Sequence, residues 1–174
     1  MEIYYINSEE FLKTHDSEFL RKYTDGCEFK SMKRFVQHAL GRYLVKTVAA
    51  KIYGLDNTEI TIENDKPKFK NGGICFSISH SGKYISAAFD KNECGLDIEE
   101  MKPRDLDSLS KRYEREFATI EDFYKFWTEY EAEIKLQSPP ANKYSCKFQE
   151  NFMLTVVSAD STFLQPSCIS HYDA

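Results

Sequence analysis

The stretch FSISHSGKYISAAFDKNECGLDIE, residues 76–99, contains the patterns that decide both the fold and the chemistry of this chain. From Cys94 to Glu99 apolar and polar residues alternate, so an extended strand directs Asp97 and Glu99 to the face opposite the apolar side chains. Two carboxylates on one face repel each other unless a hard cation such as Mg²⁺ lies between their oxygens. The pattern therefore fits either a metal site or a solvated strand edge.

The upstream part of the same stretch predicts a β-hairpin. Residues 77–82 favour a strand that enters a tight turn, and residues 84–89 favour the returning strand. His80 then lies at the tip with a serine on each side, where its imidazole and nearby backbone N–H groups can receive an anion. Taken alone, His80 fits an ordinary turn histidine better than an anion ligand.

Three blocks of this stretch resemble a known family in their order and spacing. They are Phe-Ser-Ile-Ser-His-Ser-Gly at 76–82, Ala-Ala-Phe-Asp at 87–90 and Gly-Leu-Asp-Ile-Glu at 95–99. Together they resemble the signature of the 4′-phosphopantetheinyl transferases of the surfactin-synthetase-activating type. The resemblance implies an α+β fold of two similar halves related by pseudo-twofold symmetry. Residues 1–90 would form the side that binds the adenine and 3′-phosphate of coenzyme A, and residues 91–174 the metal and catalytic side.

Composition limits the remaining function classes. The 174 residues carry a net charge of −5, which argues against general nucleic-acid binding. No apolar run approaches the ~18 residues that a membrane span needs, and the N-terminus does not resemble a signal peptide. The five cysteines form no Cys-x-x-Cys pair, which favours reduced thiols. We expect a cytoplasmic monomer that binds neither nucleic acid nor membranes.

Hydrophobic periodicity predicts the order of the elements along the chain. We expect a strand at 2–6, a helix at 8–23, a long helix at 31–53, a strand at 58–63, a helix at 105–117 that covers the site, a long helix at 121–136, strands at 144–148 and 152–158, and a loose tail over 159–174.

The first long helix begins with a basic cluster, Lys30, Lys33 and Arg34. Such a cluster is either a solvated face of an acidic protein or a phosphate clamp. The resemblance implies the clamp, with these residues meeting the 3′-phosphate of coenzyme A. The position at which the family is expected to carry an arginine holds Gln37 instead, followed by His38.

Two further contacts with coenzyme A follow from the resemblance. Lys66-Pro67 resembles the family's Gly-Lys-Pro block, with Asp65 in the place of the glycine, which makes Lys66 a nucleotide contact. Ser79 and His80 would hold the 3′-phosphate. On its own, a lysine before a proline is common in turns.

The second long helix carries an apolar stripe and a polar flank. Glu131 lies four residues after Trp127, and Lys135 four after Glu131, so both polar groups share one flank and can face inward together. The alternative is a plain Glu–Lys pair on a wet surface. We expect the apolar residues at helical spacing to enter the core: Phe123, Trp127, Tyr130 and Ile134.

Residues 127–135 resemble the family block Trp-x-x-Lys-Glu-Ala-x-x-Lys. Tyr130 replaces the first lysine of that block, and Leu-Gln-Ser-Pro-Pro at 136–140 stands where a glycine-containing loop is usual. Both departures concern contacts with phosphate. They keep open a degenerate relative that binds coenzyme A or a carrier protein without turnover.

The resemblance implies a complete reaction. A serine hydroxyl of an acyl or peptidyl carrier protein attacks the β-phosphorus of coenzyme A and releases 3′,5′-bisphosphoadenosine. Asp97, Glu99 and Glu131 would hold Mg²⁺, or Mn²⁺ in its place, Glu131 would also take the serine proton, and Lys135 would neutralise the phosphates. A metal-dependent phosphodiesterase is a further alternative. The sequence does not indicate which carrier protein or pathway is served.

Overall fold

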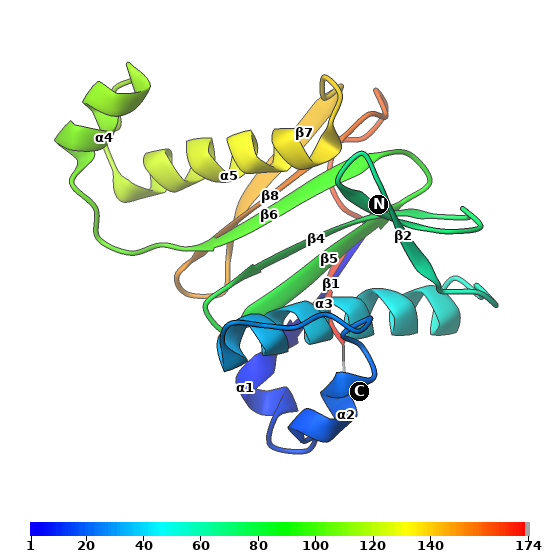
Figure 1. Ribbon diagram of the computed structural model, residues 1–174. Helices are drawn as coiled ribbons and strands as arrows, with labels where there is room; N and C mark the ends of the chain where they lie inside the picture. Colours follow the sequence, from blue (N-terminus) through cyan, green and yellow to red (C-terminus); the bar gives the residue numbers. More distant parts are fainter. Residues whose placement is uncertain (173–174) are drawn as a thin grey trace.

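The structure, a computed structural model, describes residues 1–172 and is a mixed α/β fold (Figure 1). In chain order its elements are β1 (Glu2–Asn7), α1 (Ser8–Phe11), α2 (Ser17–Arg21), α3 (Met32–Lys51), β2 (Ile60–Glu63), β3 (Lys66–Phe69), β4 (Cys75–Ser81), β5 (Tyr84–Asp90), β6 (Cys94–Glu100), α4 (Leu106–Tyr113), α5 (Ile120–Leu136), β7 (Asn142–Phe148), β8 (Phe152–Ser158) and β9 (Cys168–His171).

The first half is a long helix on a sheet with strand order β4-β5-β1-β9. Helix α3 begins after Ser31, whose hydroxyl accepts a hydrogen bond from Arg34 N, and ends before Gly54, in agreement with the predicted helix. Gly41 brings α3 onto β4, because a Cβ there would lie 3.2 Å from the Ile78 side chain. Leucine, valine and aromatic side chains from α3, β4 and β5 form the core beneath.

The second half repeats this plan with different elements. Its sheet has the order β6-β8-β7, all antiparallel, and α5 lies across it (Figure 1). Strand β8 is buried along its whole length, and Asp97 of β6 lies opposite Thr155 of β8. Both halves therefore place one long helix on a sheet whose hairpin strands are antiparallel, and the pseudo-twofold relation between them stays a proposal.

Three serines of the predicted hairpin join the two halves. Strands β4 and β6 run side by side and parallel without a backbone ladder between them (Figure 1). Alternate serine hydroxyls of β4 instead accept hydrogen bonds from alternate backbone N–H groups of β6. The pairs are Ser77 with Leu96 N at 2.9 Å, Ser79 with Ile98 N at 3.2 Å, and Ser81 with Glu100 N at 3.0 Å.

The predicted loose tail is wrong for residues 168–171. They form β9, which pairs in parallel with β1, so that Cys168 lies opposite Glu2 and Ile169 opposite Ile3. The reason is that β1 has an open edge beside β9, and edge backbone groups find a partner when a chain segment can reach them. The end of the described chain thus completes the sheet of the first half.

The predicted single helix at 8–23 is also wrong. Helices α1 and α2 are separate, because Thr14 Oγ1 donates to the Phe11 carbonyl at 3.1 Å and Asp16 caps α2 by accepting from Phe19 N at 2.8 Å. Short polar side chains that bond the local backbone compete with a continuous helix. The break lets Phe11 and Leu20 both reach the core.

Half of the apolar stripe predicted on α5 lies outside the core. Tyr130 is 49% exposed and Ile134 is 52% exposed. The cause is Gly95 of β6, at which a Cβ would lie only 2.0 Å from the Ala132 carbonyl oxygen. The helix backbone rests directly on the strand there, so small side chains such as Thr128 and Ala132 fill the buried face.

In residues 1–172 we find no helix with the length and apolar character that crossing a membrane requires.

Candidate active site

Asp97 lies at the centre of the candidate site, between β4 and α5. Its residue is only 4% exposed. Asp97 Oδ1 accepts hydrogen bonds from Ser79 Oγ at 2.8 Å and from Lys135 Nζ at 2.6 Å. Asp97 Oδ2 is buried and has no hydrogen-bond partner. A buried carboxylate oxygen without a partner is costly, which makes it available to a ligand.

Lys135 reaches this carboxylate from α5. Its ammonium also donates to Ser79 Oγ and to the Leu96 carbonyl, each at 3.0 Å. The side chain remains 30% exposed. Lys135 therefore links the helix to both strands, and its ammonium is the counter-ion of Asp97 in this structure.

Glu99 is half-buried and accepts a hydrogen bond from Ser81 Oγ at 2.7 Å. Desolvation raises the pKa of the Glu99 carboxyl above its usual value, and the charge of Asp97 adds to this increase. Hydrogen bonds from Ser81 and Trp127 and the charge of Lys135 oppose it. The net effect is a raised pKa, so a nearby cation would stabilise the ionised form of Glu99.

Glu131 lies on the flank of α5 that faces these two carboxylates. One turn before it, Trp127 hydrogen-bonds to Glu99, and one turn after it, Lys135 contacts Asp97. Residues four apart in a helix lie on one face, so Glu131 occupies the position between these two contacts. Within residues 1–172 the Glu131 carboxylate makes no hydrogen bond or ion pair.

His80 is exposed but lies within β4, where it pairs with Ile85, so its predicted place at the tip of the hairpin is wrong. Desolvation lowers the pKa of its imidazole, a backbone hydrogen bond raises it, and the positive charge of Lys135 lowers it further. Smaller effects come from Asp97, which raises the pKa, and from Lys33, which lowers it. His80 thus interacts electrostatically with the Asp97–Lys135 pair and with one residue of the predicted basic cluster.

The basic cluster predicted as a clamp is only partly gathered at the site. Lys33 lines an open groove of about 690 Å³, together with Gly82, Lys83 and Glu100 near the turn between β4 and β5. Lys30 and Arg34 are exposed at the start of α3 and make no side-chain hydrogen bond or ion pair within residues 1–172. Their role as phosphate ligands stays a prediction.

Two polar side chains near His80 were not assigned from the sequence. His38 Nε2 and Arg42 Nη1 are both buried without a hydrogen-bond partner, although Arg42 Nε pairs with Asp25 at 3.3 Å. Desolvation lowers the pKa of His38, and the charges of Arg42 and His80 lower it further, while Asp25 raises it. The sequence signal was the stripe His38, Arg42 and Lys46, at spacing four on one helix face.

Lys66 makes an ion pair within the protein. Its ammonium is buried and donates to Glu93 Oε2 at 2.6 Å and to the Cys94 carbonyl at 3.1 Å. These bonds tie β3 to the start of β6. The predicted contact with nucleotide stays a prediction that requires this ion pair to open.

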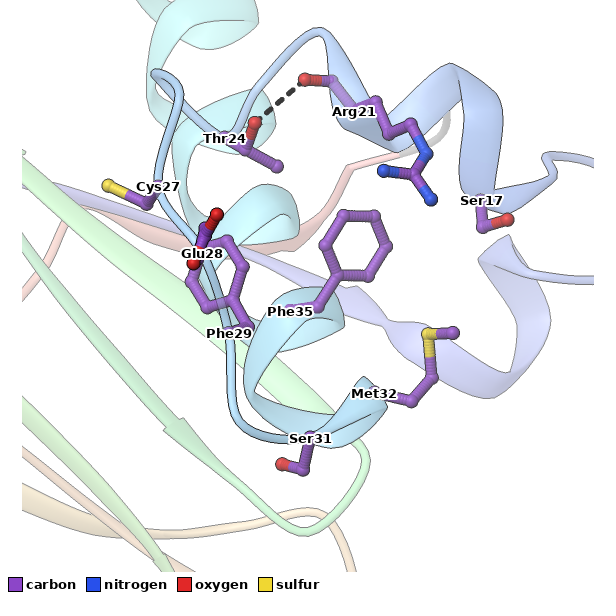
Figure 2. Close-up of a pocket in the computed structure, with 9 residues that line it drawn as sticks. All are labelled: Ser17, Arg21, Thr24, Cys27, Glu28, Phe29, Ser31, Met32 and Phe35. Atoms are coloured by element: carbon purple, nitrogen blue, oxygen red, sulfur yellow. Dashed lines mark hydrogen bonds between the residues drawn. The ribbon is translucent and has the colours of Figure 1, made fainter.

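A further cavity of about 410 Å³ lies between α2 and the start of α3. Figure 2 shows the Arg21 side chain and the Phe29 and Phe35 rings around it, with Thr24 hydrogen-bonded to the Arg21 carbonyl. None of the residues that line it belongs to the predicted site.

The carboxylates of Asp97 and Glu99 fit a divalent cation in one respect. Asp97 and Glu99 share a strand face, and Asp97 Oδ2 is a buried oxygen that lacks a partner. Carboxylate oxygens are the ligands that Mg²⁺ prefers. In the described part of the chain, however, no three His, Cys, Asp or Glu side chains are gathered as a metal site. The predicted trio therefore requires a rearrangement of Asp97, Glu99 and Glu131 to bind a metal.

Comparison with known proteins decides the family. The chain is 32% identical over 154 residues to a 4′-phosphopantetheinyl transferase of Bacillus subtilis, over 78% of this chain and 67% of that protein. The chain belongs to the 4′-phosphopantetheinyl transferases. It is also 27% identical over 186 residues to the transferase Sfp of Bacillus subtilis strain 168, over 92% of this chain and 83% of Sfp. No family model matches the chain.

These relatives confirm the family that the motifs of residues 76–99 indicated. Another relative, the transferase AcpT of Salmonella typhimurium, is 33% identical over 122 residues, which cover 62% of this chain and 56% of AcpT. The chain is an enzyme of this kind.

Proposed function

We propose that this transferase moves the 4′-phosphopantetheine arm of coenzyme A to a serine of an acyl or peptidyl carrier protein. The serine oxygen bonds to the β-phosphorus, and the bond from that phosphorus to the bridging oxygen breaks. The leaving group, 3′,5′-bisphosphoadenosine, keeps the electron pair, and the serine proton passes to a base. The transferase names of the relatives favour this reaction over a binder without turnover and over a phosphodiesterase.

One observation carries the proposal. The flank of α5 that bears Trp127, Glu131 and Lys135 lies against the strand face that bears Asp97 and Glu99. Glu131 is the acid of this group without a hydrogen bond or ion pair in residues 1–172, so it is free to accept the serine proton. Lys135 is placed to neutralise charge that grows on the diphosphate.

Asp97, Glu99 and Glu131 would hold Mg²⁺, with Mn²⁺ as a substitute. When bound, the cation would supply Lewis-acid neutralisation of the diphosphate oxygens. Ser79 and Ser81 support this role from β4, because their hydroxyls donate to the carboxylates of Asp97 and Glu99. Hydrogen bonds of this kind orient a ligand before the metal arrives.

The other end of coenzyme A would lie toward α3. His80 and Lys33 interact electrostatically at this end, and the unpartnered His38 Nε2 and Arg42 Nη1 add hydrogen-bond donors beside them. A phosphate monoester is the ligand that such a group of donors suits. We assign the 3′-phosphate to this region, with Ser79, Lys30 and Arg34 as further predicted contacts, and we keep Lys66 as a predicted contact of the nucleotide.

We also propose that the protein acts as a cytoplasmic monomer built from the two halves 1–90 and 91–174. The five cysteines, none of them in a disulfide, support a reducing compartment. Strand β9 supports a close association of the halves, because it comes from the second and joins the sheet of the first.

The test is transfer of a fluorescent pantetheine arm from labelled coenzyme A to an apo carrier protein. We expect Mg²⁺-dependent label on the carrier, and none on a carrier whose acceptor serine is replaced by alanine. Acyl and peptidyl carriers are assayed in parallel, which identifies the class of partner. Binding of coenzyme A by calorimetry without label on any carrier would contradict the proposal and favour the degenerate binder.

A further inference from the structure

Lys135 occupies the place of a cation at Asp97. Its ammonium contacts three oxygens at once, Asp97 Oδ1 at 2.6 Å, Ser79 Oγ at 3.0 Å and the Leu96 carbonyl at 3.0 Å. Two of these oxygens belong to β6 and one to β4, so the ammonium lies at the junction of the two halves. The charge of the buried Asp97 carboxylate is therefore already balanced in the free protein.

This pairing conflicts with the two roles that the proposed function gives to the same residues. A divalent cation on Asp97 would lie close to the ammonium, and like charges at a few ångströms repel strongly where water is largely excluded. Lys135, in turn, cannot serve the diphosphate of coenzyme A while it is held by Asp97. Neither partner can simply leave, since a buried unpaired carboxylate is strongly unfavourable.

We propose that Lys135 is an exchangeable counter-ion. In the free enzyme it neutralises Asp97; a divalent cation then replaces it there, and the released ammonium moves to the diphosphate of coenzyme A. This inference rests on the proposed function. It predicts that the cation and coenzyme A bind with positive coupling, because each ligand favours the arrangement that the other needs.

The first experiment measures Mn²⁺ binding by calorimetry without coenzyme A. Lys135→Met removes the competing ammonium and should tighten Mn²⁺ binding by about tenfold or more. Lys102→Met is the matched control, because Lys102 pairs with the neighbouring Glu100 at 2.9 Å but does not contact Asp97. Its Mn²⁺ affinity should change by less than about twofold, as expected for an exposed pair. Equal affinities of the two variants would overturn the exchange.

A second experiment uses the wild-type protein, so that it does not depend on whether Lys135→Met folds. The rate at which an amine-reactive reagent labels Lys135 is followed by mass spectrometry, with the exposed Lys91 as internal reference. At a Mn²⁺ concentration that saturates the protein, labelling of Lys135 relative to Lys91 should accelerate several-fold. An unchanged relative rate would overturn the exchange.

The outcomes separate this inference from the proposed function, because neither experiment includes a carrier protein. A chain that transfers pantetheine, but whose Lys135→Met variant binds Mn²⁺ no more tightly than Lys102→Met, would overturn the exchange alone. A chain that shows the exchange but labels no carrier would overturn the function alone.

Discussion

The two long helices meet their sheets in different ways, and this difference separates the roles of the two halves. On α3 the glycine belongs to the helix, where Gly41 accepts the Ile78 side chain of β4. On α5 the glycine belongs to the strand, where Gly95 accepts the helix backbone at Ala132. The closer approach of α5 brings the long side chains on its flank onto the carboxylates of β6.

The polar atoms of the two halves differ accordingly. Around α5, the ammonium of Lys135 is held by Asp97 Oδ1, so a cation at that oxygen must replace the lysine, although Asp97 Oδ2 has no partner. On α3, His38 Nε2 and Arg42 Nη1 have no hydrogen-bond partner, so a ligand can bind there without displacing a lysine. We infer that the α5 half performs the chemistry and the α3 half holds the nucleotide.

Glu131→Gln should produce the largest effect, because it removes both charge and proton affinity from the catalytic half. Turnover should fall by about 10²-fold or more, while coenzyme A binding should change far less. Stopped-flow transfer assays and calorimetry measure the two quantities separately. If Glu131 only paired with Lys135 on a wet helix face, the substitution would leave turnover nearly unchanged.

His80→Ala tests the nucleotide half. Loss of a hydrogen bond to a charged phosphate costs roughly 1.5–3 kcal/mol, or about 10- to 150-fold in affinity. The Michaelis constant should therefore rise for coenzyme A and change little for 3′-dephospho-coenzyme A. Lys51→Met removes a charge from the last turn of α3 and serves as the control. Equal losses with both substrates would remove His80 from the phosphate site.

Ser81→Ala tests whether the serines between the halves position the metal ligands. Ser81 Oγ donates to Glu99 and lowers the pKa of its carboxyl, so the variant should bind Mn²⁺ about 10- to 100-fold more weakly. Because the pKa of Glu99 would rise, the affinity should also recover only at higher pH. Ser81→Thr keeps the hydroxyl and should restore both properties. A threonine variant as weak as the alanine variant would contradict a positioning role.

The smallest effect concerns His38 and the dependence of stability on pH. The folded protein holds the pKa of His38 below its ordinary value of 6.5, so the unfolded chain binds the proton more readily. The contribution of neutral His38 to the free energy of unfolding is therefore present above pH 6.5 and is lost as the pH falls toward the folded pKa. His38→Leu should make this decline shallower in urea titrations between pH 7.5 and 5.5. Identical slopes would contradict this, because they would show that the fold does not lower the pKa of His38.

The sequence was most informative where local pattern and function coincide. Alternation in residues 94–99 predicted β6, and spacing of four placed Glu131 and Lys135 on one flank. Prediction from the sequence failed where residues distant in the chain determine the burial or the pairing of a segment. Tyr130 and Ile134 looked like core residues because periodicity cannot reveal that Gly95 admits the helix backbone. The edge of β1 that recruits residues 168–171 was likewise invisible without the topology.

The site shows the same limit. Asp97, Glu99 and the serines that hold them lie in one short stretch, so their spacing was readable. The pairing of Lys135 with Asp97 joins residues 38 positions apart. Asp25 pairs with Arg42 Nε but leaves Arg42 Nη1 without a hydrogen-bond partner. Both are properties of packing rather than of pattern.

The most direct test of the central claim, that the contact between α5 and β6 is the active centre, is Asp97→Asn. The amide oxygen can still accept from Ser79, which keeps the fold, but the charge that holds Lys135 and would hold the metal is lost. Transfer per folded molecule, with the folded fraction measured by thermal unfolding, should fall by about 10²-fold or more. A folded variant that transfers pantetheine at the wild-type rate would contradict the account.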